Sequence, residues 1–190
     1  AGGDTIVVAN EVITYTVDIV NNGNAPAYDT VLQDILPDGF RQGGINTTSI
    51  TLQPAGTPLP NLVPTYDPVT GIAIWDFDNG GADTYTIPVG ETLRVIYTVQ
   101  ADAAIGPGLT LTNAAAATLY YSFDDEAIPV NSVVGDREIY GPSNTGQTTL
   151  TTSPGAPLKE NPVATTATIG EEFTYTITVP EAPQPTPLYD

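Results

Sequence analysis

Oxygen ligands of the kind that bind calcium are concentrated in residues 76–83. Gly80 and Gly81 lie inside this stretch and permit a bend, and the expected bidentate glutamate at the twelfth position is absent because Ile87 stands there. The stretch therefore predicts either a calcium loop or a plain acidic hairpin loop. Its candidate metal ligands are Asp76, Asp78, Asn79 and Asp83.

A second acidic patch follows later in the chain. Patches of this kind usually form a solvated face, and the other interpretation is a calcium ion that bridges two modules. No other cofactor is suggested by the residue types. The residues of this patch are Asp124, Asp125, Glu126, Asp136 and Glu138.

Three aromatic residues, Trp75, Tyr120 and Tyr121, have side chains that could stack on a sugar. Trp75, however, lies in alternation with Ile72, Ile74 and Phe77, which favours packing in a core. The residues therefore leave two interpretations open, core packing and a sugar- or surface-binding site. We expect core packing for Trp75.

The composition excludes several functional classes. Histidine and cysteine are both absent, which removes the commonest general base and the thiolate nucleophile, so an enzyme is not expected. The 22 acidic and 4 basic residues give a net charge of −18, which provides no basic surface for nucleic acid and disfavours anionic membranes. No apolar run has the length of a membrane span, so direct membrane insertion is not expected. An extracellular, cell-surface protein fits this composition.

The sequence of the first predicted strand is repeated near the end of the chain. Residues 11–17 read EVITYTV and residues 171–177 read EEFTYTI, so Tyr15 and Tyr175 are separated by 160 positions. Self-similarity at a fixed period is typical of an array of repeats. We expect one module over residues 1–158, with a Pro/Gly/Ser/Thr-rich exit segment, followed by residues 159–190 as the start of a second repeat or as a donor strand.

Alternation of apolar and polar residues dominates the pattern and predicts strands. Many short strands separated by Gly/Pro turns predict an all-β fold, an antiparallel β-sandwich with a C-terminal strand extension. Residues 114–117 are a run of alanines that we interpret as a closely packed strand, and residues 123–158 are expected to return as an edge strand. The predicted strands cover residues 12–20, 27–36, 49–52, 72–77, 93–101, 109–121 and 148–152.

Five motifs in order resemble the domain of unknown function 11 repeat and the fimbrial isopeptide-forming D2-type domain of bacterial or archaeal surface proteins. The tail from Lys159 to Asp190 resembles the start of the next repeat. The five motifs lie at residues 12–24, 31–39, 66–76, 88–99 and 111–114.

This resemblance implies an immunoglobulin-like sandwich used as a building block of surface fibres, pilus-like filaments and adhesin stalks. Some relatives form an amide bond between a lysine on the first strand and an asparagine on a late strand, assisted by a buried acid. Asn113 matches the asparagine and Asp34 the acid. The first-strand lysine would fall one position before residue 1, and Lys159 belongs to the second copy. Lys159 is therefore either the amine of a crosslink or a solvated linker residue.

The tail alternates in the same way as the first strand, and its apolar positions form a candidate inter-subunit strand. A half-buried strand without partners exposes backbone donors and acceptors and invites addition to another sheet. The predicted partners are copies of this chain or adjacent repeats, joined head-to-tail; the alternative function is a sugar- or surface-binding adhesin domain. The inter-subunit strand residues are Phe173, Tyr175, Ile177 and Val179.

Overall fold

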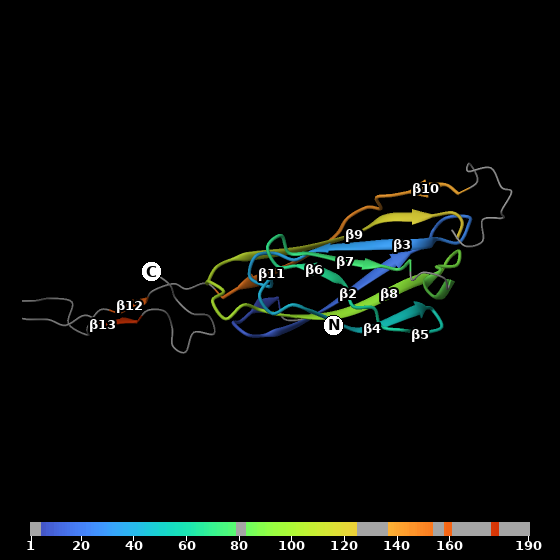
Figure 1. Ribbon diagram of the computed structural model, residues 1–190. Coiled ribbons are helices and arrows are strands. Elements are labelled where there is room, and N and C mark those ends of the chain that lie inside the picture. Colours follow the sequence, from blue (N-terminus) through green and yellow to red (C-terminus); the bar gives the residue numbers. More distant parts are fainter. Residues whose placement is uncertain (1–4, 79–82, 125–136, 154–157, 161–175, 179–190) are drawn as a thin grey trace, which may run out of the picture.

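The protein is built from two packed β-sheets (Figure 1). The structure is a computed structural model that describes residues 5–78, 83–124, 137–153, 158–160 and 176–178. Within these ranges the single helical element is one 3-10 turn, η1 (Asp83–Tyr85), and no helix is long and apolar enough to cross a bilayer. The predicted all-β sandwich is confirmed.

The larger sheet has strands from the start and the end of the sandwich at one edge and strands from the middle of the chain at the other. Its order is β1-β11-β9-β3-β7-β6, and β10 pairs with β9 in addition. All described pairings in it are antiparallel except that of β1 with β11, which is parallel. Its strands are β1 (Ile6–Val7), β11 (Gly146–Thr152), β9 (Thr110–Tyr121), β3 (Tyr28–Ile35), β7 (Ile72–Asp76), β6 (Thr65–Asp67) and β10 (Ile139–Tyr140).

The smaller sheet faces the larger one and has the order β2-β8-β4-β5. Its pairings are antiparallel, and the pair of β2 with β8 runs without a break over nine residues. Its strands are β2 (Val12–Val20), β8 (Thr92–Gln100), β4 (Ile45–Gln53) and β5 (Thr57–Leu59).

The long strands agree with the alternation in the sequence, and the alanine run at 114–117 lies inside β9 as predicted. Five of the described strands were not predicted, because each has only two or three residues, too few to show an alternating pattern. These strands are β1, β5, β6, β10 and β12, the last of which covers Leu158–Glu160. The expected edge position of residues 148–152 holds only in part. β1 pairs with β11 at Thr151 and Thr152 and forms the edge there, whereas no described strand pairs with that side of residues 148–150.

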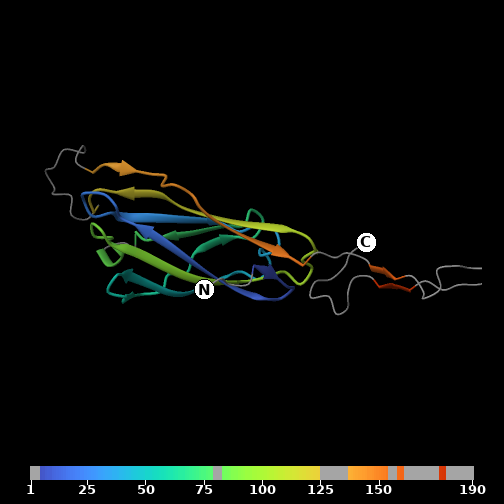
Figure 2. The same cartoon turned by 180° about the vertical axis from the view of Figure 1, so that it is seen from behind.

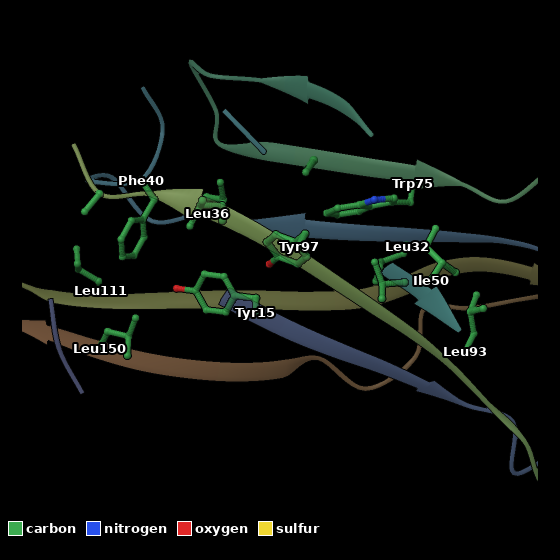
Figure 3. Close-up of a cluster of buried hydrophobic side chains, with 14 of the residues drawn as sticks. Tyr15, Leu32, Leu36, Phe40, Ile50, Trp75, Leu93, Tyr97, Leu111 and Leu150 are labelled. Atoms are coloured by element: carbon green, nitrogen blue, oxygen red, sulfur yellow. The ribbon is translucent and has the colours of Figure 1, made fainter. Parts of the chain in front are cut away.

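The core lies between the sheets and is built from inward-facing positions of both. Trp75 is fully buried and its indole Nε1 donates to Thr47 Oγ1 at 2.9 Å, so its predicted place in the core is confirmed. Tyr97 lies against it, with ring centroids 5.1 Å apart, and Tyr15 lies 5.5 Å from Tyr97 (Figure 3). Such offset aromatic contacts add to the stabilisation that burial provides.

Two short strands stand apart from both sheets. β12 (Leu158–Glu160) and β13 (Thr176–Thr178) pair with each other in antiparallel fashion, with Lys159 opposite Ile177. Both views of the molecule place them beyond one end of the sandwich (Figures 1 and 2). The other predicted residues of the inter-subunit strand, at positions 173, 175 and 179, lie outside the described residues.

Candidate functional site

Asp34 and Asn113 meet inside the core of the sandwich. On β3 the inward positions are Thr30, Leu32 and Asp34, because side chains alternate between the faces of a strand. On β9 the same alternation turns Asn113 inward. Asp34 lies opposite Ala115 on β9, so Asn113 is its diagonal neighbour on the same face of the sheet.

A tyrosine from the opposite sheet completes the contact. Asn113 Nδ2 donates to Asp34 Oδ2 at 3.1 Å and to the Tyr97 hydroxyl at 3.0 Å. The Tyr97 hydroxyl in turn donates to Asp34 Oδ2 at 2.6 Å. Tyr97 stands on β8, in the middle of the smaller sheet, so this polar triad of Asp34, Tyr97 and Asn113 joins the two sheets.

Burial of the triad is nearly complete. Asp34 and Tyr97 have no exposed surface, and Asn113 is 4% exposed. Even so, Asp34 Oδ1 and Asn113 Oδ1 have no hydrogen-bond partner among the residues that the structure describes, and neither has the hydroxyl of Tyr15 nearby. Buried polar groups normally have partners, because an unpaired one costs about 1–3 kcal/mol. These unpaired oxygens mark the triad as a site rather than ordinary core packing.

The surroundings change the acidity of the triad. Burial raises the pKa of Asp34 from 3.8 to about 6, and the hydrogen bonds from Tyr97 and Asn113 partly offset this rise. Burial also raises the pKa of Tyr97 above its usual value, and the negative charge of Asp34 acts in the same direction. The pKa of Tyr15 is raised by the same two causes. Asp34 is therefore an acid that can hold or release a proton near neutral pH.

A cavity of about 450 Å³ leads to Asn113 from the side of the sandwich. It lies between β2 of the smaller sheet and β9 and β11 of the larger one, with Tyr15 and Asn113 in its wall. Small side chains, Ala115 and Ala117, leave the space open on the side of β9. A group that entered this cavity would meet the carboxamide of Asn113.

The structure unites two of the three residues proposed for the crosslink. Asp34 and Asn113 are in contact, whereas Lys159 belongs to β12 in the separate two-stranded sheet. An acid and an amide can together transfer the amide carbonyl to an amine. Within the described residues of this molecule, no lysine lies beside Asp34 and Asn113.

The calcium prediction at residues 76–83 is only partly covered by the structure. Asp76 lies at the end of β7, and its Oδ1 accepts from the backbone N–H of Asp78 at 3.2 Å. Asn79 lies outside the described residues, and so does the side chain of Asp83. The described residues contain no cluster of three or more acidic side chains placed to hold a metal ion. Calcium at this loop stays a prediction.

The second acidic patch is described only at Asp124 and Glu138, and Glu138 Oε2 accepts a hydrogen bond from the Tyr140 hydroxyl.

The sugar-binding interpretation of Trp75 is wrong, since that side chain is buried. Tyr120 stacks on Tyr140 with ring centroids 5.5 Å apart, and the guanidinium of Arg137 covers Tyr121 at 3.4 Å.

Sequence reasoning missed Tyr97 and Tyr15 as members of this site. Both lie in strands whose apolar and polar residues alternate, and alternation alone does not mark a residue as part of a polar site. The signal that could have identified Tyr97 is its hydroxyl, because a buried tyrosine hydroxyl usually finds a polar partner. Asp34, also at an inward position, could supply that partner.

Comparison with known proteins adds little to this geometry. No protein-family model matches the chain, and no curated protein matches it. Among solved structures, the chain is similar to AvmM, described as catalysing macrocyclization in alchivemycin A biosynthesis, with 13% identity and a TM-score of 0.44. The match covers 87% of this chain and 89% of that one. The prediction that excluded enzymes is contradicted by this neighbour and is withdrawn, although a likeness this weak assigns no activity to the chain.

Proposed function

We propose that this chain is a structural module of an extracellular fibre, pilus-like filament or adhesin stalk, joined head-to-tail to neighbouring modules. One observation carries the proposal: the buried contact between the Asp34 carboxyl and the Asn113 carboxamide. The repeat of the first strand after 160 residues and the net charge of −18 support it from the sequence. The family resemblance adds an immunoglobulin-like topology to the proposal.

The contact suits the formation of an amide bond with a lysine. The neutral lysine amine attacks Cγ of Asn113, a new C–N bond forms, and the bond from Cγ to Nδ2 breaks to release ammonia. Asn113 Nδ2 already donates to Asp34 Oδ2, so the departing nitrogen faces the acid that can protonate it. Asp34 then recovers a proton from the attacking amine, so that protons balance over the whole step.

Lys159 supplies the amine in this proposal, since it is the sole lysine of the chain. The lysine would come from a neighbouring module, because β12 lies beyond the end of its own sandwich (Figure 2). Such a bond would lock modules into a fibre that denaturants and heat do not dissociate.

The test is denaturing electrophoresis combined with intact-mass measurement on concentrated protein. Linked chains should form a ladder, and each link should lower the summed mass by about 17 Da, the mass of ammonia. Asn113→Ala removes the acceptor and Lys159→Arg removes the nucleophile while keeping the charge, so neither variant should form the ladder. A wild-type protein that stays monomeric at unchanged mass would refute the covalent lock.

A second candidate function, a sugar- or surface-binding adhesin domain, rests on the stacked pair of Tyr120 and Tyr140. Tyr140 is 41% exposed, so its outer face is open to solvent. Exposed aromatic faces bind the apolar face of sugars. A glycan array would test this function, and selective binding that is lost in Tyr140→Ala and kept in Trp75→Phe would favour it.

A further inference from the structure

Within the described ranges, no strand lies between the edge strands of the two sheets on one side of the sandwich. β2 is the edge of the smaller sheet, and among the described strands it pairs only with β8. On the larger sheet, β1 covers β11 only at Thr151 and Thr152. We call the region between β2 and the uncovered part of β11, Gly146–Leu150, the open seam.

On the side of the open seam, the backbone of β2 pairs with no described strand. Asn21, directly after β2, donates its N–H to the carbonyl of Glu91 beside β8 at 3.0 Å. In an antiparallel pair, alternate residues direct their N–H and C=O toward the partner. Odd-numbered residues of β2 therefore face β8, and the backbone groups of Thr14, Thr16 and Asp18 face the open seam.

The backbone of β11 does the same from the other sheet. Thr151 donates its N–H to the carbonyl of Thr5, on the side where β1 lies. By the same alternation, Gln147 and Thr149 direct their N–H groups to this side. No described strand pairs with that side of Gly146–Leu150. An added strand would find backbone partners on β11, as in other cases of strand addition.

Side-chain burial also shows that this side is incomplete. On β8, which has neighbours on both sides, the inward residues Leu93 and Val95 are fully buried. On β2 the corresponding inward residues Val17 and Ile19 are only partly buried, and both line the 450 Å³ cavity. This volume is within the range of about 300–1,000 Å³ that ligand pockets occupy. The open seam thus has room for the side chains of an extended segment.

The inner wall of the cavity selects the chemistry of its occupant. Asn113 Oδ1 and the Tyr15 hydroxyl are unpaired, their residues are 4% and 6% exposed, and both residues line the cavity. Behind them lies Asp34, whose Oδ1 is also unpaired. Carboxylate and carboxamide oxygens accept hydrogen bonds, so the complement is a donor with several N–H groups and a positive charge, such as an ammonium group.

We propose that the open seam is a docking site for an extended strand from a second copy of this chain, with Leu158–Glu160 as the docked segment. Lys159 within it is the sole lysine in 190 residues, and this segment already has strand conformation as β12. Its backbone adds to the free edge of β11, and its ammonium group reaches the unpaired oxygens around Asn113. The inference rests on the proposed function for its partner, a second copy, and does not require the amide bond.

The charge of the chain sets a condition for this association. Two copies that each carry a net charge of −18 repel each other, and salt reduces this repulsion. The screening length falls from about 10 Å at 0.1 M salt to about 3 Å at 1 M. Association between copies should therefore strengthen as salt concentration rises, while the buried contact of Lys159 is screened little.

The experiment is sedimentation velocity of the full chain over a range of concentrations, at about 0.1 M and about 1 M NaCl. Gln147→Pro removes a backbone donor that faces the open seam without removing one that faces β9, and should weaken association at least about tenfold. Gln147→Ala is the matched control and should associate as the wild type does. Lys159→Glu lies outside the sandwich and should abolish association. This variant therefore still tests the docking proposal if Gln147→Pro fails to fold.

The results separate this inference from the covalent lock. Lys159→Arg should still associate but lose no ammonia, and association with unchanged mass in the wild type would refute the lock alone. A ladder that persists in Gln147→Pro would overturn the open seam while leaving the lock intact. Unchanged association in Lys159→Glu, or a wild type that is monomeric at about 1 mM, would also overturn the docking proposal.

Discussion

Replacing Asp34 with asparagine tests the electrostatics of the buried triad. The substitution keeps the shape of the side chain and its acceptor for the Tyr97 hydroxyl, but removes the group that titrates. Because Asp34 is fully buried, its charge has no contact with solvent in the folded protein. The free energy of unfolding of the two proteins should therefore differ in its dependence on pH.

The sign and size of this difference follow from the pKa of Asp34. Its folded-state pKa of about 6 is above the ordinary 3.8, so the folded protein holds the proton more tightly than the unfolded chain does. This contribution is fully present below about pH 3.8 and is lost as the pH rises through about 6. Each unit between the two pKa values corresponds to about 1.4 kcal/mol, so ionisation of Asp34 destabilises the fold by about 3 kcal/mol at pH 8.

The assay is denaturant unfolding of wild type and Asp34→Asn at intervals from about pH 3.5 to pH 8. Relative to the variant, the wild type should lose about 3 kcal/mol across this range, mostly between about pH 4 and pH 6.5. All other acidic groups are common to both proteins and cancel in the comparison. Parallel curves, or a wild type that gains stability relative to the variant as pH rises, would show that burial does not control this carboxyl.

Two further substitutions probe the packing of the sandwich. Tyr97→Phe removes the hydroxyl that donates to Asp34, so the free energy of unfolding should fall by about 1–3 kcal/mol, and the pKa of Asp34 should rise further in a carbon-13 NMR titration. Gly71→Ala should lower the melting temperature more than Gly56→Ala, because both glycines have φ near 70° but only Gly71 would bring a Cβ to within 2.5 Å of the carbonyl oxygen of Leu36. We expect the free energy of unfolding of Gly71→Ala to be lower than that of Gly56→Ala by at least about 2 kcal/mol. Equal losses of stability in the two variants would contradict the steric explanation.

The long strands were predictable because their burial repeats every second residue. β8 shows this most clearly, since Leu93, Val95, Tyr97 and Val99 all face inward and all are buried. The short β1 could not be predicted. Its two residues form a strand only because β11, which lies about 145 positions later, pairs beside them. Such pairing depends on the arrangement of the whole chain and leaves no local pattern.

The site was predictable only in part. The resemblance singled out Asp34 and Asn113 as a pair, and the structure places them in contact. Tyr97 was missed because alternation identifies an inward position but not the partner of its hydroxyl. The position of Lys159, the third member of the predicted crosslink, could not be predicted. It is a single lysine in the tail, and no alternating pattern relates it to the strands of the core.

The parallel pairing of β1 with β11 determines how the sandwich bears tension. β1 stands at the beginning of the described chain and β11 ends the sandwich, and Ile6 lies beside Thr151 while Val7 lies beside Thr152. A pull on the chain before β1 and after β11 slides these parallel strands past each other along their length. All hydrogen bonds of the pair are then loaded at once instead of opening one after another, as they do when an antiparallel hairpin is pulled apart from its ends. A strand of only two residues is in this way the part of the larger sheet that resists a pull along the chain, and its few hydrogen bonds set the force at which the module begins to yield.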